Sequence, residues 1–211
     1  DIAGVLRVIR TLSQWRESNA GVHSVLDPLF NALAPNKYLE TAIFNAIVSE
    51  DEISDNASPA LADIRRKIRV QESKVREQLE KFTRSQTNSK FLQENIITQR
   101  NGRYVVPVKN EYRSEIAGLV HDTSSSGATV FIEPMAVVEA NNEIRVLQAK
   151  EREEIERILY ELSVQAGDFA QSIKNSYECA LELNLIFAKA QYAYKIKAMP
   201  PILNDNGIIN L

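Results

Sequence analysis

The chain has 211 residues, of which 44% are hydrophobic, and its formal net charge is -3. It is therefore long enough to bury a core, and its nearly balanced charge excludes both a strongly basic nucleic-acid binder and an acidic disordered tail. The single cysteine, Cys179, cannot form an internal disulfide, and no run approaches the ~18 apolar residues of a membrane helix, so we expect a cytoplasmic protein with no membrane partner.

Short amphipathic helices are predicted over residues 1–57. Residues 1–18 and 37–50 both place apolar side chains on one face, at a spacing of three or four. The apolar positions are Ile2, Leu6, Ile9 and Leu12 in the first segment and Leu39, Ile43, Phe44, Ile47 and Val48 in the second. The run DEISDNASP then ends the helical pattern.

A long helix is predicted within residues 58–94. Ser58 precedes Pro59, which suits a helix start, because a serine hydroxyl caps free amides and the missing N–H of proline costs nothing in the first turn. The positions at coiled-coil spacing are Leu61, Ile64, Ile68, Gln71, Val75, Leu79, Phe82 and Gln86. About thirty residues at ~1.5 Å each would make a rod of ~45 Å.

The apolar period changes to two within residues 95–133, which predicts a small antiparallel sheet. Asn101-Gly102, between NIITQR and RYVVPV, predicts a tight hairpin, since both residues accept positive φ angles. Pro107 in the second run predicts an edge position or a bulge, because proline cannot donate to a strand ladder. EIAGLVHDT and GATVFIEP are predicted as two further strands, joined by SSSG.

A second long helix is predicted over residues 134–175. Its apolar positions are Ile144, Leu147, Ile155, Ile158, Leu162, Ala166, Phe169 and Ile173. Residues 63–84 carry eight basic and four acidic side chains, while residues 139–161 carry seven acidic and four basic, so the two long helices are expected to pair. A further amphipathic helix is predicted over residues 176–198, with a buried face formed by Leu181, Leu185, Ala188 and Tyr192.

The predicted fold class is therefore mainly α with a small antiparallel β insertion. A helical base is followed by a rising helix, a sheet and a returning helix. The chain begins with Asp1 and ends with the apolar run GIINL, so we expect it to be a piece of a larger protein.

Residues 120–134, VHDTSSSGATVFIEP, hold the residue types of several kinds of site. His121, Asp122 and the serines contain the side chains of a hydrolase triad, but neighbours on a strand point to opposite faces, and no G-x-S-x-G motif is present. Gly127 is followed by a strand rather than by the lysine and helix of a phosphate-binding loop. His23 and His121 lie about a hundred residues apart, which disfavours a metal site.

Two interpretations stay open for the polar side chains of this region. Arg100, Arg103, Lys109 and Arg113 cluster on or just after the hairpin, and serine hydroxyls with turn amides can donate to phosphate oxygens. Over the whole sheet region, however, basic and acidic residues balance. The cluster is either a local polyanion contact or an ordinary solvated face.

The segment RNGRYVVPVKNEYRSEIAGLVHDTSSSGATVFIEPMAVVEANNEI, residues 100–144, closely resembles the corresponding part of the bacterial MutS-two family, the MutS-type ATPases distinct from the mismatch-repair protein MutS. RNGRYVVPVK, GLVHD, SSSGAT and the run IEP-x-x-VVE-x-NNE occur in the family's order and spacing. EISDNASPALADIRR, NLIFAKA and NDNGIINL extend the resemblance over the rest of the chain.

The resemblance implies a domain layout with a long antiparallel coiled-coil lever that carries a β clamp. The implied parts are a helical core at 1–57, the ascending lever helix at 58–94, the β clamp at 95–133, the descending lever helix at 134–175, and the core return and connector at 176–211. In the family, ATP and Mg belong to an ATPase domain, and nuclease activity belongs to a C-terminal Smr domain. Both are expected to be missing here, so this fragment is expected to hold no cofactor and to be no enzyme.

The resemblance also implies partners and a function. The family is associated with branched or double-stranded DNA and the suppression of homologous recombination, and with recognising and splitting collided ribosomes; the full-length protein is expected to be a homodimer. A non-catalytic lever and clamp would touch the DNA or ribosomal RNA backbone through Arg100, Arg103, Lys109, Arg113, Ser124, Ser125 and Ser126. The alternative is a structural dimerisation or protein-partner module without nucleic-acid contact.

Overall fold

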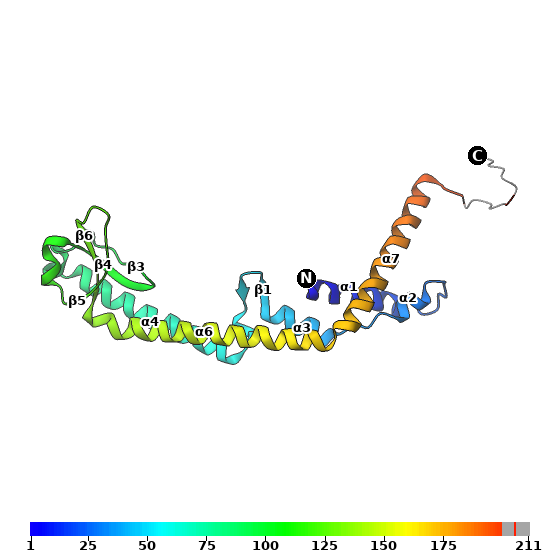
Figure 1. Ribbon diagram of the computed structural model, residues 1–211, viewed down its shortest axis with the longest axis horizontal. Helices are drawn as coiled ribbons and strands as arrows, with labels where there is room; N and C mark the ends of the chain where they lie inside the picture. The colour runs from blue at the N-terminus through cyan, green and yellow to red at the C-terminus, as the bar shows by residue number, and fades with distance from the viewer. Residues whose placement is uncertain (200–204, 206–211) are drawn as a thin grey trace. The chain divides into compact units, whose positions relative to one another are not determined.

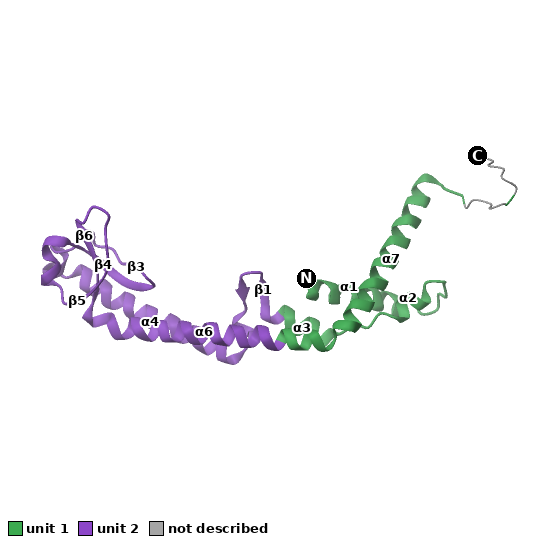
Figure 2. Cartoon of the chain, in the orientation of Figure 1, with its two compact units in different colours: residues 1–44, 162–211 green, residues 45–161 purple. Residues whose placement is uncertain are grey.

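The computed structural model describes residues 1–199 and 205, so the end of the predicted connector lies outside the described residues. The chain divides into two compact units, residues 1–44 with 162–211 and residues 45–161, which are coloured separately in Figure 2. Helices make up most of both units, and one small antiparallel sheet of four strands lies in the second. The predicted fold class is confirmed.

The first unit packs helix α7 (Ala170–Ile196) against two N-terminal helices, α1 (Ile2–Ser18) and α2 (Asp27–Asn31). Ile9, Phe30, Leu33 and Leu183 form its core. Trp15 stacks on Phe30 with ring centroids 5.5 Å apart, which adds a specific aromatic contact to the apolar burial.

The buried face predicted for α7 was wrong. Leu181, Leu185 and Tyr192 are 50%, 54% and 64% exposed, while the helix packs through Ser176 and Leu183. Apolar residues lie on more than one side of this helix, so their spacing alone could not select the side that α1 and α2 cover.

The helix predicted around residues 37–50 is shorter than expected. Helix α3 (Lys37–Ala46) ends before Ile47, which begins strand β1 (Ile47–Ser49) of a small hairpin with β2 (Glu52–Ile53). Ile47 and Val48 therefore lie in a strand rather than on a helix face. Both are β-branched, which favours extended backbone once a partner strand is available.

The start predicted for the first long helix is confirmed. After a short 3-10 turn, η1 (Asp55–Ala57), helix α4 runs over Pro59–Arg84. The Ser58 hydroxyl accepts a hydrogen bond from the Leu61 amide at 3.0 Å and donates to Glu154 at 2.6 Å. The helix is nevertheless shorter than predicted, because Ser85 is extended; Gln86 is exposed in a separate turn, α5 (Gln86–Ser89).

Helix α6 (Met135–Asp168) runs antiparallel to α4, and the two lie side by side in Figure 1. The first turns of α4 contact residues 151 and 154, while Val75 and Leu79 share a core with Val137 and Ile144. The helix predicted to reach residue 175 ends at Asp168, because Phe169 leaves helical geometry with φ -104° and ψ 7°. Ile173 therefore belongs to α7.

Charge complementarity between the two helices contributes less than the sequence suggested. Within the described ranges, one ion pair joins α4 to α6, with Arg65 Nε 2.7 Å from Glu151 Oε1. The other charged residues of these helices pair mostly within one helix, as Glu77 does with Lys81 and Glu154 with Arg157. Partners three or four residues apart are already neighbours on a helix surface, so they compete with cross-helix pairs.

The sheet has the strand order β3-β4-β6-β5 and is antiparallel throughout. Its strands are β3 (Thr98–Arg100), β4 (Arg103–Lys109), β5 (Gly118–Thr123) and β6 (Thr129–Pro134), and a 3-10 segment, η2 (Asn110–Glu115), leads from β4 towards β5. Asn101 and Gly102 have φ angles of 52° and 73°, which confirms the predicted hairpin turn. Val106, Val108, Val130 and Ile132 pack with α4 and α6 in one core.

The edge position predicted from Pro107 was wrong, since β4 lies inside the sheet. Strand β3 pairs only with Arg103–Val105, so Pro107 lies beyond its end. The Pro107 carbonyl instead accepts from the Gln93 amide at 3.0 Å, beside an isolated bridge between Leu92 and Val108. Pro107 still pairs with Phe131 on the β6 side, and a proline is tolerated in this inner strand because the short β3 leaves its other side without regular strand pairing.

Ser58→Ala should lower the free energy of unfolding of the second unit by about 1–2 kcal/mol, because the cap of α4 and a bond to a carboxylate are both lost. Urea unfolding followed by circular dichroism measures the change. Ser73→Ala is the matched control, because Ser73 is exposed within α4 and bonds only the Arg69 carbonyl; it should leave stability within about 0.5 kcal/mol. Equal effects of the two substitutions would contradict the role of the cap.

Acidification should weaken the same region through Glu154. Hydrogen bonds from Arg157 and then from Ser58 lower the pKa of the Glu154 carboxyl from 4.5 to about 2. Because the folded pKa is lowered, this stabilisation is present above pH 4.5 and is lost as the pH falls towards 2. In Arg157→Gln the pKa should rise towards 4.5, as measured by an NMR titration of the Glu154 carboxyl, and an unchanged titration would refute the assignment.

Candidate nucleic-acid interface

A buried glutamate lies at the junction between the sheet and α6. Glu133, at the end of β6, has no solvent exposure. Its oxygens accept hydrogen bonds from Arg103 at 2.8 and 3.0 Å and from the Asn141 amide at 2.7 Å, and the His121 Nε2 lies 2.5 Å away. Three donors therefore offset the large free-energy cost of burying this side chain.

The four side chains of this network come from four different elements. Arg103 begins β4, and Asn141 lies in the second turn of α6, where it also bonds the Tyr104 amide and carbonyl at 3.4 and 3.2 Å. His121 lies at a β-bulge, where the register of β5 against β6 shifts between Val120 and Asp122. The bulge re-aims a side chain at the sheet edge, as bulges commonly do. Together these bonds fix α6 to three strands.

At this junction the backbone of β5 also comes very close to β6, at Gly118. A methyl group at Gly118 would lie 2.4 Å from the Glu133 carbonyl oxygen and 2.6 Å from an Ile132 methyl carbon. Both contacts are shorter than real side chains tolerate, so this position requires glycine.

Arg103 takes part in the network rather than facing solvent. Its side chain is 14% exposed, and besides its two bonds to Glu133 it donates to Asn142 at 2.5 Å. Three of the five N–H donors of this guanidinium are therefore directed to partners inside the protein. The geometry favours a positioning role for Arg103 over the predicted contact with nucleic acid.

The other predicted cations lie at the surface. Arg100 is 38% exposed, with its guanidinium 4.1 Å from the centre of the Phe131 ring and its Nε 3.3 Å from Asp122. Lys109 donates to the Lys90 carbonyl at 3.2 Å. Arg113 is exposed and has no ion pair or side-chain hydrogen bond within the described part of the chain. The fold leaves these three cations at least partly accessible.

The serine loop is organised by its own hydrogen bonds. The Ser124 hydroxyl accepts from the Thr129 amide at 3.0 Å, and the Ser126 hydroxyl lies 3.3 Å from it and 3.5 Å from the Ala128 amide. Gly127 supplies the positive φ angle, 71°, that closes the turn. Of these three serines, exposed Ser125 has a hydroxyl that makes no hydrogen bond within residues 1–199 and 205.

The side chains of the hydrolase triad do not come together. His121 contacts Glu133, Asp122 pairs with Arg100, and the serines bond their own loop. Asp122 and His121 thus serve different partners, as their strand positions predicted.

The remaining candidate residues show ordinary environments. His23 is exposed beside Asp27, and Cys179 is half-buried against the core of the first unit. Residues 1–199 and 205 contain no group of three or more His, Cys, Asp or Glu side chains able to hold a metal ion. Within the same residues, no helix is both long and apolar enough to cross a membrane.

Known proteins named Endonuclease MutS2 match nearly the whole chain. The protein of Acetivibrio thermocellus is 46% identical over 206 residues, which cover 96% of this chain and 26% of that protein. Those of Ruminiclostridium cellulolyticum and Clostridium beijerinckii are 46% and 45% identical, covering 99% and 100% of this chain and 26% and 27% of their own lengths. The chain belongs to the MutS2 family. It spans about a quarter of the length of these curated relatives. No family model matches it.

Sequence reasoning missed the buried network of this MutS2 segment, although it predicted the strand GATVFIEP, which contains Glu133. A usable clue was present: Glu133 follows an apolar strand directly, and two asparagines, Asn141 and Asn142, follow two turns into the next helix. The partners Arg103 and His121 could not be assigned from spacing, because cross-strand register and a bulge bring them together.

Glu133→Gln should lower the stability of the MutS2 segment by about 3–5 kcal/mol, because Arg103 is left without its buried counter-charge. Urea unfolding of Glu133→Gln, Arg103→Gln and the double variant measures the coupling. The double variant should be destabilised by clearly less than the sum of the two single effects. Additive effects would show that the two side chains do not act as a pair.

Proposed function

We propose that this segment is a non-catalytic lever and clamp of a MutS2 protein. In this proposal the sheet contacts the phosphate backbone of branched or double-stranded DNA, or of ribosomal RNA. The paired helices α4 and α6 relay motion that ATP hydrolysis drives elsewhere in the whole protein. The relatives are named Endonuclease MutS2, and an endonuclease acts on nucleic acid, which agrees with such a contact.

The single observation that supports the contact is the division of the sheet's cations into one that is largely buried and three that are accessible. Arg103 is neutralised by a buried carboxylate, whereas Arg100, Lys109 and Arg113 keep solvent access. The Arg100 guanidinium lies over the Phe131 ring, a cation–π contact that helps to hold it in place. Together with the Ser125 hydroxyl, these groups suit contact with phosphates without selection of a base sequence.

The relay is supported by bonds that prevent the two helices from sliding independently. At one end Ser58 and Arg65 of the α4 region bond Glu154 and Glu151 of α6, and at the other end Asn141 of α6 bonds Glu133 and Tyr104 of the sheet. A displacement of α6 would therefore reach the strands. For the whole MutS2 protein we propose ATP and Mg binding, endonuclease activity, homodimer formation and a cytoplasmic location. These properties are not assigned to the residues named above.

Removing the accessible cations should weaken binding of a four-way DNA junction or an RNA duplex. The triple variant Arg100→Gln, Lys109→Gln, Arg113→Gln should lower the slope of log K against log salt by about one unit per cation, because each phosphate contact releases counterions. Fluorescence anisotropy over a salt series measures the slope.

The triple variant Arg66→Gln, Lys67→Gln, Lys74→Gln is the control, because it removes the same charge from exposed positions of α4. It should bind nearly as the unmodified chain does. Equal losses of affinity in both variants would show that net charge, and not the position of the cations on the sheet, determines binding. That result would contradict the assignment of the contact to the sheet.

A second candidate function is a structural assembly module, favoured by the exposed apolar side chains of the first unit. Trp15, Leu181, Leu185 and Tyr192 on α1 and α7 are each about half exposed or more. Apolar surface of this kind commonly marks contact with another protein surface. Sedimentation and junction binding of a Leu181→Ser, Leu185→Ser variant separate the two functions: altered assembly with unchanged nucleic-acid binding supports the assembly module.

A further inference from the structure

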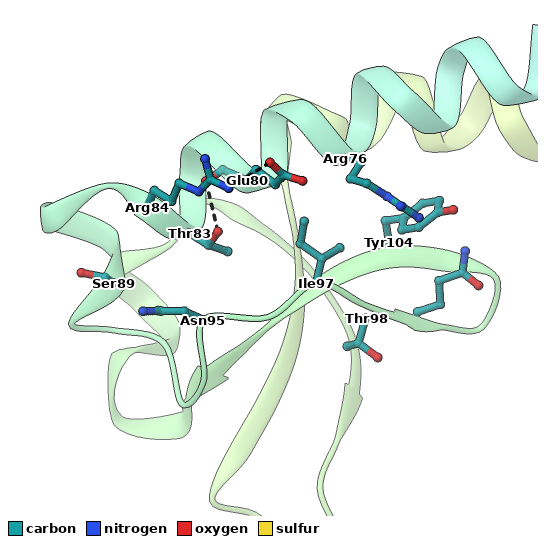
Figure 3. Close-up of a pocket in the computed structure, with 10 residues that line it drawn as sticks. Arg76, Glu80, Thr83, Arg84, Ser89, Asn95, Ile97, Thr98 and Tyr104 are labelled. Carbon is teal, nitrogen blue, oxygen red and sulfur yellow. Dashed lines mark hydrogen bonds and ion pairs between the residues drawn. The ribbon is translucent and has the colours of Figure 1, made fainter.

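A polar groove lies between α4 and the segment that leads into β3. Its volume is about 870 Å³. Figure 3 shows Arg76, Glu80, Thr83 and Arg84 along the helix side, and Asn95, Ile97 and Thr98 along the facing segment. None of these residues belongs to the cation cluster that the sequence singled out.

The two arginines of the groove differ in their pairing. Glu80 lies between them on α4 and pairs with Arg84 at 3.3 Å. A glutamate prefers a cation four residues after it to one four residues before it, because that order suits the helix dipole, which agrees with the pairing of Glu80 with Arg84. Arg76 pairs neither with Glu80 nor with Glu72, which lies four residues before it, and has no carboxylate partner within the described residues, unlike its neighbours Arg69 and Lys81.

The groove also offers uncommitted donors. The side-chain amides of Asn95 and Gln99 make no hydrogen bond in the described part of the chain, and both residues are exposed. Arg76 and Arg84 are two helical turns apart, which is ~12 Å along the axis. Donors distributed over this length suit a repeating anion better than one small anion, since one phosphate could not reach both arginines.

We propose that this groove binds the phosphate backbone of a nucleic-acid strand, with Arg76 as its principal cation and Arg84, Asn95 and Gln99 as supporting donors. The inference rests on the proposed function and extends the contact from the sheet onto α4. It places one strand of the bound nucleic acid along the last turns of the helix.

The test is the double variant Arg76→Gln, Arg84→Gln in the 211-residue chain, with a four-way DNA junction and an RNA duplex as probes. Binding should weaken, and the salt slope should fall by up to about two units, most of it carried by Arg76. The matched control is Arg66→Gln, Lys74→Gln, which removes two charges from α4 outside the groove. Far-UV circular dichroism and urea midpoints of all variants establish that the fold is retained.

Each outcome bears on the inference. A loss in the groove variant that the control does not show supports it. A groove variant with an unchanged slope overturns it while leaving the proposed function intact, provided that the Arg100, Lys109, Arg113 variant loses binding. An unmodified chain that binds neither probe overturns both. Inorganic phosphate that competes as well as the junction at equal phosphate concentration would show a site for a free anion and also overturn the inference.

Discussion

A carboxyl group without solvent exposure needs partners on every side, and this requirement at Glu133 determines how the small sheet is joined to its helix. The partners come from β4, β5 and α6, so the network can form only when all three elements are in register. Such a network specifies one arrangement more strongly than apolar packing, since a shift of one residue would leave buried polar groups unsatisfied. The bulge at His121 and the glycine at position 118 follow from the same constraint.

Pairing also divides the arginines into those that hold the structure and those left for a partner. Arg103 and Arg65 are committed to carboxylates inside the second unit, while Arg76 and Arg113 have none within the described residues. A count of charges along the sequence does not distinguish these four arginines from one another. A MutS2 segment with a nearly neutral sequence can therefore still present local positive charge, because its acidic residues are used by selected arginines rather than shared evenly.

Much of the secondary structure followed from local chemistry. The start of α4 at Ser58 and Pro59 and the turn at Asn101-Gly102 depend on the few residues that form them, so the sequence predicted both. The ends of the long helices and the covered side of α7 were predicted less well. The strand at Ile47 pairs with the nearby Ile53, and Phe169 leaves helical geometry at a single residue; the apolar spacing continues through both positions, so spacing alone does not mark where these helices end.

By itself the sequence determined the family, the alternation of long helices with a small sheet, and the set of cations that a nucleic-acid contact could use, because motifs, periodicity and composition are local properties. Only the tertiary structure decided which of those cations is buried against a carboxylate and which remain accessible. Whether an arginine meets a carboxylate depends on strand register, on a bulge and on helix pairing, which bring together residues such as Arg103 and Glu133 that lie thirty positions apart. An arginine that is buried beside a carboxylate, as Arg103 is, bonds the protein itself and is no longer available to a ligand.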